Sequence, residues 1–254
     1  MHIGDKEHIV SFLKKDILKN MNMVYFMEGY PICTLQQINS HVLLRGESDR
    51  NWVYISGSQD SGLARVIDAL SEEDRCFAAI EDWMFSAIVR GRELAWRLSA
   101  VKLILPEETT FSSAPLTWIT PLSLKDVPHI YASSFYKALT SPEYIRERIT
   151  RGPSAGVYES GELVAWAMTH DDLSIGVMNV LEPYRRKRYA FDLTVYLIEQ
   201  VRALGKIPYV HVEETNLTSL ELAHKVGFRK DRRLHWFEIK GEQNNTPLGQ
   251  RIRR

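Results

Sequence analysis

The segment 190–205 constrains the fold most, because its pattern is that of an amphipathic helix between two short apolar segments. Apolar residues recur along it at helical spacing: Ala190, Leu193, Leu197, Val201 and Leu204. Gly205 follows at the position expected of a helix C-cap. The apolar segments 173–181 and 207–214 on either side are typical of strands. Strand, helix and strand in succession predict an α/β fold.

The pattern divides the chain into two halves joined by a linker. In the first half we expect helices at 7–21, 60–70 and 73–90, and strands at 23–29 and 95–108. Two more strands around a polar turn are expected within 41–57. In the second half we expect strands at 116–122, 173–181, 207–214 and 232–240 and a hairpin at 155–170. Helices are expected at 123–137, 141–151, 190–205 and 216–227. The segment 106–115 is rich in Pro, Ser and Thr and is predicted to be the linker, and the polar segment 241–254 a tail outside the core.

Composition excludes several classes of protein. The 32 basic and 32 acidic residues cancel, whereas a protein that binds nucleic acid usually carries a basic surplus. Cys33 and Cys76 suit neither a disulfide framework nor a metal cluster, so no metal is implied and a reducing cytoplasm is expected. No apolar run reaches the roughly 18 residues that span a bilayer. We therefore expect no nucleic-acid or membrane partner, while a homodimer is compatible with this composition.

A basic run stands between the strand 173–181 and the amphipathic helix. Residues 182–190 read EPYRRKRYA, with four consecutive basic side chains from Arg185 to Arg188. The first turn of a helix presents unpaired N–H groups and a partial positive charge, so a basic loop at this position suits a pyrophosphate. A solvated charged loop and a nucleic-acid patch are the other interpretations of such a run.

The order and spacing of elements from 116 to 240 resemble the GNAT superfamily of acyl-CoA-dependent N-acyltransferases. Arg185 and Ala190 fit the phosphate-loop pattern of that family, Arg/Gln-x-x-Gly-x-Gly/Ala, and NLTSLELAHKVGF (216–228) resembles its Asn-x-x-Ser/Ala helix that ends in Gly-Phe. LEPYR (181–185) and HVEETN (211–216) are most similar to the glycine N-acyltransferase-like branch. The resemblance implies two GNAT-like halves, each a mixed twisted sheet flanked by helices. It places a degenerate domain at 1–112, an acyl-CoA-binding domain at 113–240 and the tail at 241–254.

The implied activity is transfer of an acetyl or short acyl group from CoA to a small amine or amino acid, by direct attack in a ternary complex. Acetyl-CoA or another short acyl-CoA would be the co-substrate. The resemblance assigns its binding to Val180, Arg185, Arg186, Lys187, Arg188, Tyr189, Ala190, Phe191, Asn216 and Ser219. Splaying of the strand 207–214 from 173–181 would open a slot for the pantetheine arm, and a backbone N–H of 173–181 would polarise the thioester.

The chain departs from the family pattern at three positions. Ser174 stands where a glutamate base is common, Arg188 where the loop has Gly, and Ala223 where a tyrosine acid is common. As general base we favour Glu213 or Asp172, with His211 in reserve and His170 and Asp171 nearby. The departures also leave open a non-catalytic acyl-CoA-binding or scaffold protein. A second loop-like motif, QDSGLA (59–64), follows a strand in the first half and is interpreted as structural.

Overall fold

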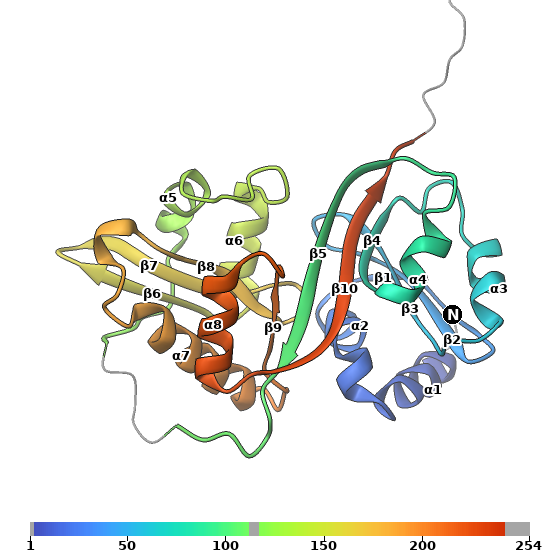
Figure 1. Cartoon of the computed structure of the whole chain (residues 1–254), viewed down its shortest axis with the longest axis horizontal. Helices are drawn as coiled ribbons and strands as arrows, with labels where there is room; N and C mark the ends of the chain where they lie inside the picture. The colour runs from blue at the N-terminus through green and yellow to red at the C-terminus, as the bar shows by residue number, and fades with distance from the viewer. Residues whose placement is uncertain (1–2, 112–116, 242–254) are drawn as a thin grey trace, which may run out of the picture.

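A computed structural model describes residues 3–111 and 117–241, in which ten strands form one continuous mixed sheet with helices on both faces (Figure 1). The strand order is β1-β2-β3-β4-β10-β5-β9-β8-β7-β6. All neighbours are antiparallel except β3 with β4 and β8 with β9. The α/β fold class is therefore confirmed.

Both halves repeat one plan of strands. The first half contains α1 (Ile3–Lys14), α2 (Ile17–Gly29), β1 (Ile32–Ile38), β2 (His41–Glu47), β3 (Asn51–Ser56), α3 (Gly62–Asp68), β4 (Cys76–Glu81), α4 (Asp82–Ile88) and β5 (Leu94–Ile104). The second contains the 3-10 turn η1 (Leu124–Asp126), α5 (Val127–Ala132), α6 (Pro142–Arg151), β6 (Ser154–Glu159), β7 (Glu162–Thr169), β8 (Ile175–Val180), the 3-10 turn η2 (Glu182–Tyr184), α7 (Tyr189–Ala203), β9 (Tyr209–Val212), α8 (Leu217–Val226) and β10 (Arg229–Ile239). In each half, three antiparallel strands are followed by a helix and a parallel fourth strand, then by a second helix and a long fifth strand.

The fifth strands are exchanged between the halves. β10 lies between β4 and β5, and β5 in turn pairs with β9 of the second half. The ten paired positions of β5 and β10 at the centre of the sheet join the two half-sheets into one (Figure 1). The division of the chain into domains by sequence position remains a prediction.

Alternating side chains place a core on each face of each half-sheet. In β2, Val42 and Leu44 are buried against α1 and α2, whereas Leu43 between them is buried against α3 and α4. In the second half, α7 and α8 cover one face and α5 and α6 the other. Helices thus cover the centre of both half-sheets, while most of β1 and the first residues of β5 and β10 keep contact with solvent.

Two predictions in the first half are wrong at α2. The predicted helix 7–21 is two helices that break at Lys15 and Asp16, and the predicted strand 23–29 is the second part of α2. Asp16 caps α2 by accepting a hydrogen bond from the N–H of Lys19 (3.2 Å). Residues 20–27 are all buried, so apolar residues are not confined to one face of the helix and the sequence shows no helical alternation.

Two further predictions fail where apolar runs were misassigned. The predicted helix 73–90 includes β4, a central strand whose Phe77 and Ile80 are fully buried, and short apolar runs of this kind do not distinguish strand from helix. Of residues 117–122, which the structure describes, only Thr120 forms a bridge, to Gly156, so the predicted strand 116–122 is wrong there. Strand β1 (Ile32–Ile38) was not predicted at all, and the remaining predicted elements agree to within a few residues. Residues 112–115 of the linker and 242–254 of the tail lie outside the described residues.

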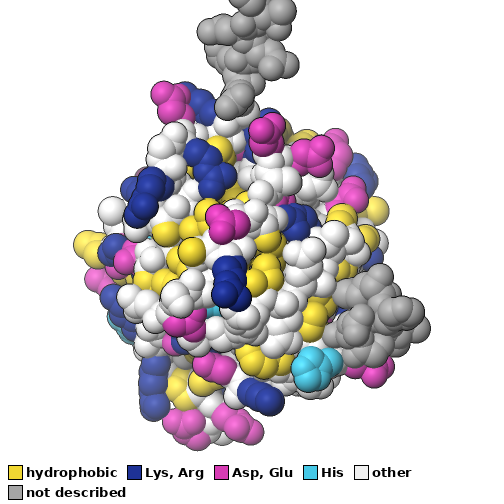
Figure 2. All heavy atoms as spheres, turned by 90° about the vertical axis from the view of Figure 1, so that its right-hand side faces the viewer, with side chains coloured by type: hydrophobic (Ala, Val, Ile, Leu, Met, Phe, Trp, Pro, Cys, Tyr) yellow, Lys and Arg dark blue, Asp and Glu magenta, His cyan; other side chains and the backbone are white. Residues whose placement is uncertain are grey.

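Basic and acidic side chains are interspersed on the face of the first half that Figure 2 presents, with apolar patches between them. No helix in the described ranges is both long and apolar enough to span a bilayer.

Candidate active site

The slot between β8 and β9 is the centre of the candidate site. The two parallel strands pair only at Ile175 and Val210, and β9 is held on its other side by four paired positions with β5. Beyond Ile175 the strands diverge, and a cavity of about 340 Å³ opens between them. The splayed strands predicted from the resemblance are therefore present.

A β-bulge in β8 accompanies this divergence. Val177 has φ +43°, a left-handed conformation that is strained for a β-branched residue. The register with β7 shifts here, so that Val177 and Met178 together oppose Ala167. The extra residue of a bulge leaves the hydrogen-bond ladder, and both residues line the cavity. Backbone polar groups of β8 are thereby released from the ladder beside the cavity.

The basic loop has the backbone of an anion cradle. Arg186 (φ +64°) and Arg188 (φ +71°) are left-handed, although neither is glycine. In the part of the chain that the structure describes, the N–H groups of residues 186–191 donate no hydrogen bond to protein atoms. Two left-handed residues before a helix of 15 residues can direct neighbouring backbone N–H groups to one place. The loop can therefore surround a phosphate with backbone donors without a glycine at 188.

Two side chains of the loop, Lys187 and Arg188, have partners among other protein groups. Arg188 Nε donates to Asp192 Oδ1 (2.9 Å), and its guanidinium lies 4.6 Å from the Phe191 ring centroid. Lys187 pairs with Glu159 (3.0 Å). Arg188 thus packs along the start of α7, against Asp192 and Phe191.

The predicted co-substrate residues fall into two groups. Val180 and the loop residues 185–191 lie outside the cavity wall, and the Val180 carbonyl accepts a hydrogen bond from Arg185 Nε (3.2 Å). Asn216 and Ser219 line the cavity from α8, where Asn216 also caps the helix by accepting from the Ser219 N–H (3.1 Å). Ala223, at the position of the missing tyrosine, lines the same wall.

Asp172 lies at the inner end of the cavity with both carboxylate oxygens hydrogen-bonded. Oδ1 accepts from the N–H (3.0 Å) and hydroxyl (2.6 Å) of Ser174, and Oδ2 accepts from Asn22 of α2 (2.7 Å). Burial opposes ionisation, but neighbouring His211 and His170 and the bonds from Ser174 hold the pKa of Asp172 below its usual range. A carboxylate so fully satisfied suits a positioning role better than proton abstraction.

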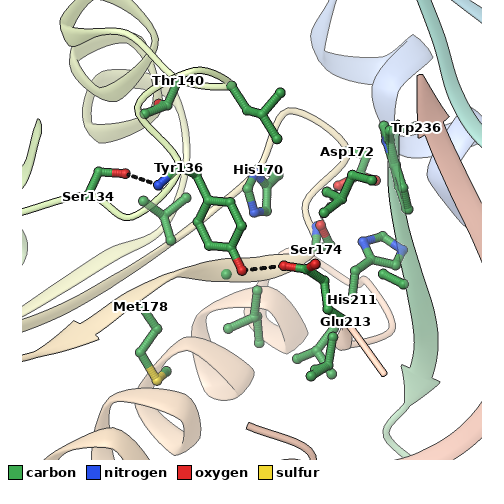
Figure 3. A pocket seen from close by; sticks show the side chains of 18 of the residues that line it. Ser134, Tyr136, Thr140, His170, Asp172, Ser174, Met178, His211, Glu213 and Trp236 are labelled. Atoms are coloured by element: carbon green, nitrogen blue, oxygen red, sulfur yellow. Dashed lines mark hydrogen bonds between the residues drawn. The ribbon is translucent and has the colours of Figure 1, made fainter. Parts of the chain in front are cut away.

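His211 is a neutral ring beside it. Asn22 Nδ2 lies 3.1 Å from His211 Nε2, and because an amide NH2 group can only donate, Nε2 is the acceptor and the ring proton is on Nδ1. Burial lowers the pKa of His211 to about 3, against the field of Asp172. The ring packs 4.6 Å from that of Trp236 (Figure 3). The geometry therefore gives little support to His211 as an alternative general base.

Asp171 differs from its neighbour Asp172. Its Oδ2 accepts a hydrogen bond from Ser48 in the β2–β3 turn (2.7 Å), whereas Oδ1 accepts none from the described residues. Burial and the adjacent charge of Asp172 raise the pKa of Asp171 to about 7. The carboxyl lines the cavity and would change its charge near neutral pH.

His170 completes this cluster. Its Nδ1 lies 3.0 Å from the Tyr144 hydroxyl, and burial lowers its pKa. Within the described ranges, no group of three or more His, Cys, Asp or Glu has the arrangement of a metal site.

Glu213 lies at the end of β9 and faces Tyr136 across the cavity (Figure 3). The Tyr136 hydroxyl donates to Glu213 Oε1 (2.5 Å), and burial together with this carboxylate raises the pKa of Tyr136 to about 12. Tyr136 was not predicted from the sequence, nor were Asn22 and Ser48. Each approaches the site only through the tertiary fold, and no local pattern marks them.

The motif at 59–64 does not form a loop like that at 185–191. Asp60 accepts from the N–H of Gly62 (2.7 Å), and α3 has only seven residues. The corresponding space between β3 and β4 measures about 20 Å³ and is lined by Lys19 and Asn20 of α2. The structural interpretation of this motif agrees with that geometry.

Comparisons with known proteins agree with this architecture. Residues 154–237 match the family model described as FR47-like protein, while none of the curated proteins matches the chain. Solved structures with a similar fold include a Drosophila protein (TM-score 0.67, 18% identity, covering 80% of this chain and 75% of that one). They also include a GNAT family acetyltransferase from Colwellia psychrerythraea (0.51, 13%, 89% and 97%) and a tandem GNAT protein of the clavulanic acid biosynthesis pathway (0.52, 13%, 89% and 89%). The chain thus has the fold of GNAT acetyltransferases, and the FR47-like match supports that superfamily for its second half.

Proposed function

We propose that the protein is an N-acyltransferase that moves an acetyl or short acyl group from CoA to a small-molecule amine. The observation that carries the proposal is the alignment of three features along β8 and α7. The unpaired N–H groups of 186–191 precede α7, the slot opens between β8 and β9, and carboxylates line its inner end. A pyrophosphate, an extended arm and a reacting thioester need these features in this order.

The proposed roles follow from position. The N–H groups of 186–191 would bind the pyrophosphate, and Asn216 and Ser219 would border the arm on the α8 side. The strained bulge at Val177 would provide the N–H that polarises the thioester carbonyl. The resemblance to the glycine N-acyltransferase-like branch belongs to this proposal as an indication of ancestry and does not identify the acceptor.

Glu213 is the proposed general base. Its carboxylate faces the cavity and is oriented by the Tyr136 hydroxyl, while both oxygens of Asp172, the other candidate, already accept hydrogen bonds. The amine nitrogen attacks the carbonyl carbon, its proton passes to Glu213, and the carbon–sulfur bond breaks to release the thiolate of CoA. A thiol of pKa about 8.5 leaves without an obligatory acid, which accommodates Ala223.

Calorimetric titration with acetyl-CoA tests the binding part of the proposal. Wild type should bind, and Arg186→Ala should weaken binding, with Arg90→Ala, an exposed arginine of the first half, as the matched control. Arg188→Gly should retain binding, because the Arg188 side chain packs against Asp192 and Phe191. If wild type is silent while Arg188→Gly binds, Arg188 blocks the cradle and the enzyme proposal fails.

Release of free thiol in the presence of an amine panel tests catalysis. Thiol release that depends on both acetyl-CoA and an amine supports the transferase. Binding of acetyl-CoA without thiol release for any amine would instead support a non-catalytic acyl-CoA-binding protein.

A further inference from the structure

The wall of the cavity is strongly acidic. Four carboxylates line it, at Asp49, Asp171, Asp172 and Glu213. Among the described lining residues, the guanidinium of Arg50 is the sole Lys or Arg group. The two lining histidines, His170 and His211, have lowered pKa values because they are buried, so they add no positive charge at neutral pH.

Arg50 is already engaged by protein groups. It donates to Glu238 Oε2 (3.1 Å) and lies 3.9 Å from Asp49. Its guanidinium lies 5.3 Å from the Trp96 ring centroid, and the Trp96 indole N–H donates to the same Glu238 oxygen (2.8 Å). A carboxylate entering the cavity would therefore find acidic neighbours and a guanidinium that already has partners.

An aromatic cluster from the central sheet lines the cavity beside Asp49 and Arg50. Trp52 of β3, Trp96 of β5 and Trp236 of β10 line the cavity, and Tyr54 of β3 lies beside them. Trp52 and Trp96 form an edge-to-face pair with centroids 6.3 Å apart. Indole faces bind flat apolar groups and attract ammonium groups. This wall suits a substrate with an apolar or aromatic body.

We propose that the acceptor is a primary amine with an aromatic or apolar body and no carboxylate. The body packs against the three tryptophans, and the amine nitrogen lies toward Glu213 and the free oxygen of Asp171. This assignment rests on the proposed acyl transfer and narrows its acceptor, because an amino acid would bring a carboxylate next to the acidic wall.

Matched pairs of acceptors test the assignment. Phenethylamine against phenylalanine, and tryptamine against tryptophan, differ only by the carboxylate. With acetyl-CoA, each amine should show kcat/KM at least about tenfold above its amino acid, because the like charges at this wall repel the acid. Equal or faster acylation of the amino acids would overturn the assignment and leave acyl transfer intact.

A binding measurement separates this inference from the catalytic one. Phenethylamine should quench the tryptophan fluorescence of the full-length protein in the absence of acetyl-CoA, and phenylalanine should not. At pH 8, where the Asp171 carboxyl is ionised, Asp171→Asn should weaken phenethylamine binding about tenfold, since it removes a charge from the wall. Asp68→Asn, on the exposed side of α3, is the matched control and should bind like wild type. Equal binding of both ligands, or no effect of Asp171→Asn, would overturn the acceptor class. If the wild-type protein binds phenethylamine but does not bind acetyl-CoA, only the proposed acyl transfer would be refuted.

Discussion

Asp171→Asn should make the protein more stable at neutral pH than wild type. In the folded chain the carboxyl has a pKa of about 7, against an ordinary value of 3.8, because burial and Asp172 oppose its ionisation. Between these values the folded state keeps a proton that the unfolded state has lost. The stabilising contribution is therefore full below about pH 4 and is lost as the pH rises through 7.

The magnitude follows from the difference of about three pKa units. Each unit corresponds to about 1.4 kcal/mol, so ionisation of Asp171 costs at most about 4 kcal/mol of folding free energy at pH 8. Asparagine has the same shape, can still accept the hydrogen bond from Ser48, and carries no charge to bury. The stability of the variant relative to wild type should be near zero at pH 4 and rise by up to about 4 kcal/mol by pH 8.

Urea denaturation of both proteins across this range measures the effect. The difference between the two curves is the quantity to follow, because the lowered pKa values of His170 and His211 shift wild-type stability in the opposite direction and are shared by the variant. A stability difference that stays constant from pH 4 to pH 8 would refute the assignment of a raised pKa to Asp171.

Three further substitutions test the site. Glu213→Gln should lower kcat about 100-fold with acetyl-CoA affinity unchanged by calorimetry, because it removes the proposed base and no contact to the phosphate cradle. Tyr136→Phe should lower kcat about tenfold, since the hydroxyl that orients Glu213 is lost, and an unchanged kcat would remove Tyr136 from the site. Asn22→Ala should reduce the free energy of unfolding by about 2 kcal/mol in urea, because Asp172 and His211 both lose their buried donor.

The second half was predicted more closely than the first because its signals are local. The apolar stripe of α7, the Asn216 cap and the turn at 159–161 each depend on residues a few positions apart. In the first half, residues 20–27 of α2 are all buried and β4 is a short apolar run, so neither has a period that separates helix from strand. The exchange of β5 and β10 left no mark in the sequence, since either pairing satisfies the same alternating pattern.

In the candidate site too, residues marked by local motifs could be predicted, whereas their distant partners could not. The basic loop and α8 could be located from motifs, and Asp172 and Glu213 from their places beside strands. Their hydrogen-bond partners could not, because Asn22 lies 150 positions from Asp172 and Tyr136 lies 77 positions from Glu213. Contacts over such distances are set by tertiary packing, which a single sequence does not reveal.

The strand exchange explains how a chain with two similar halves comes to have one large cavity. The space between β3 and β4 measures about 20 Å³ and is lined by side chains of α2, whereas the slot between β8 and β9 opens to about 340 Å³ although residues of α5 and α6 line it. Because β5 pairs with β9, and β10 with β4, the aromatic face of the first half is brought against the open slot of the second. The filled half thus supplies Trp52 and Trp96, which join Trp236 of β10 in the aromatic wall, and the donors Asn22 and Ser48 to carboxylates of the open half. The cavity requires both halves, so the proposed acceptor site should not survive their separation.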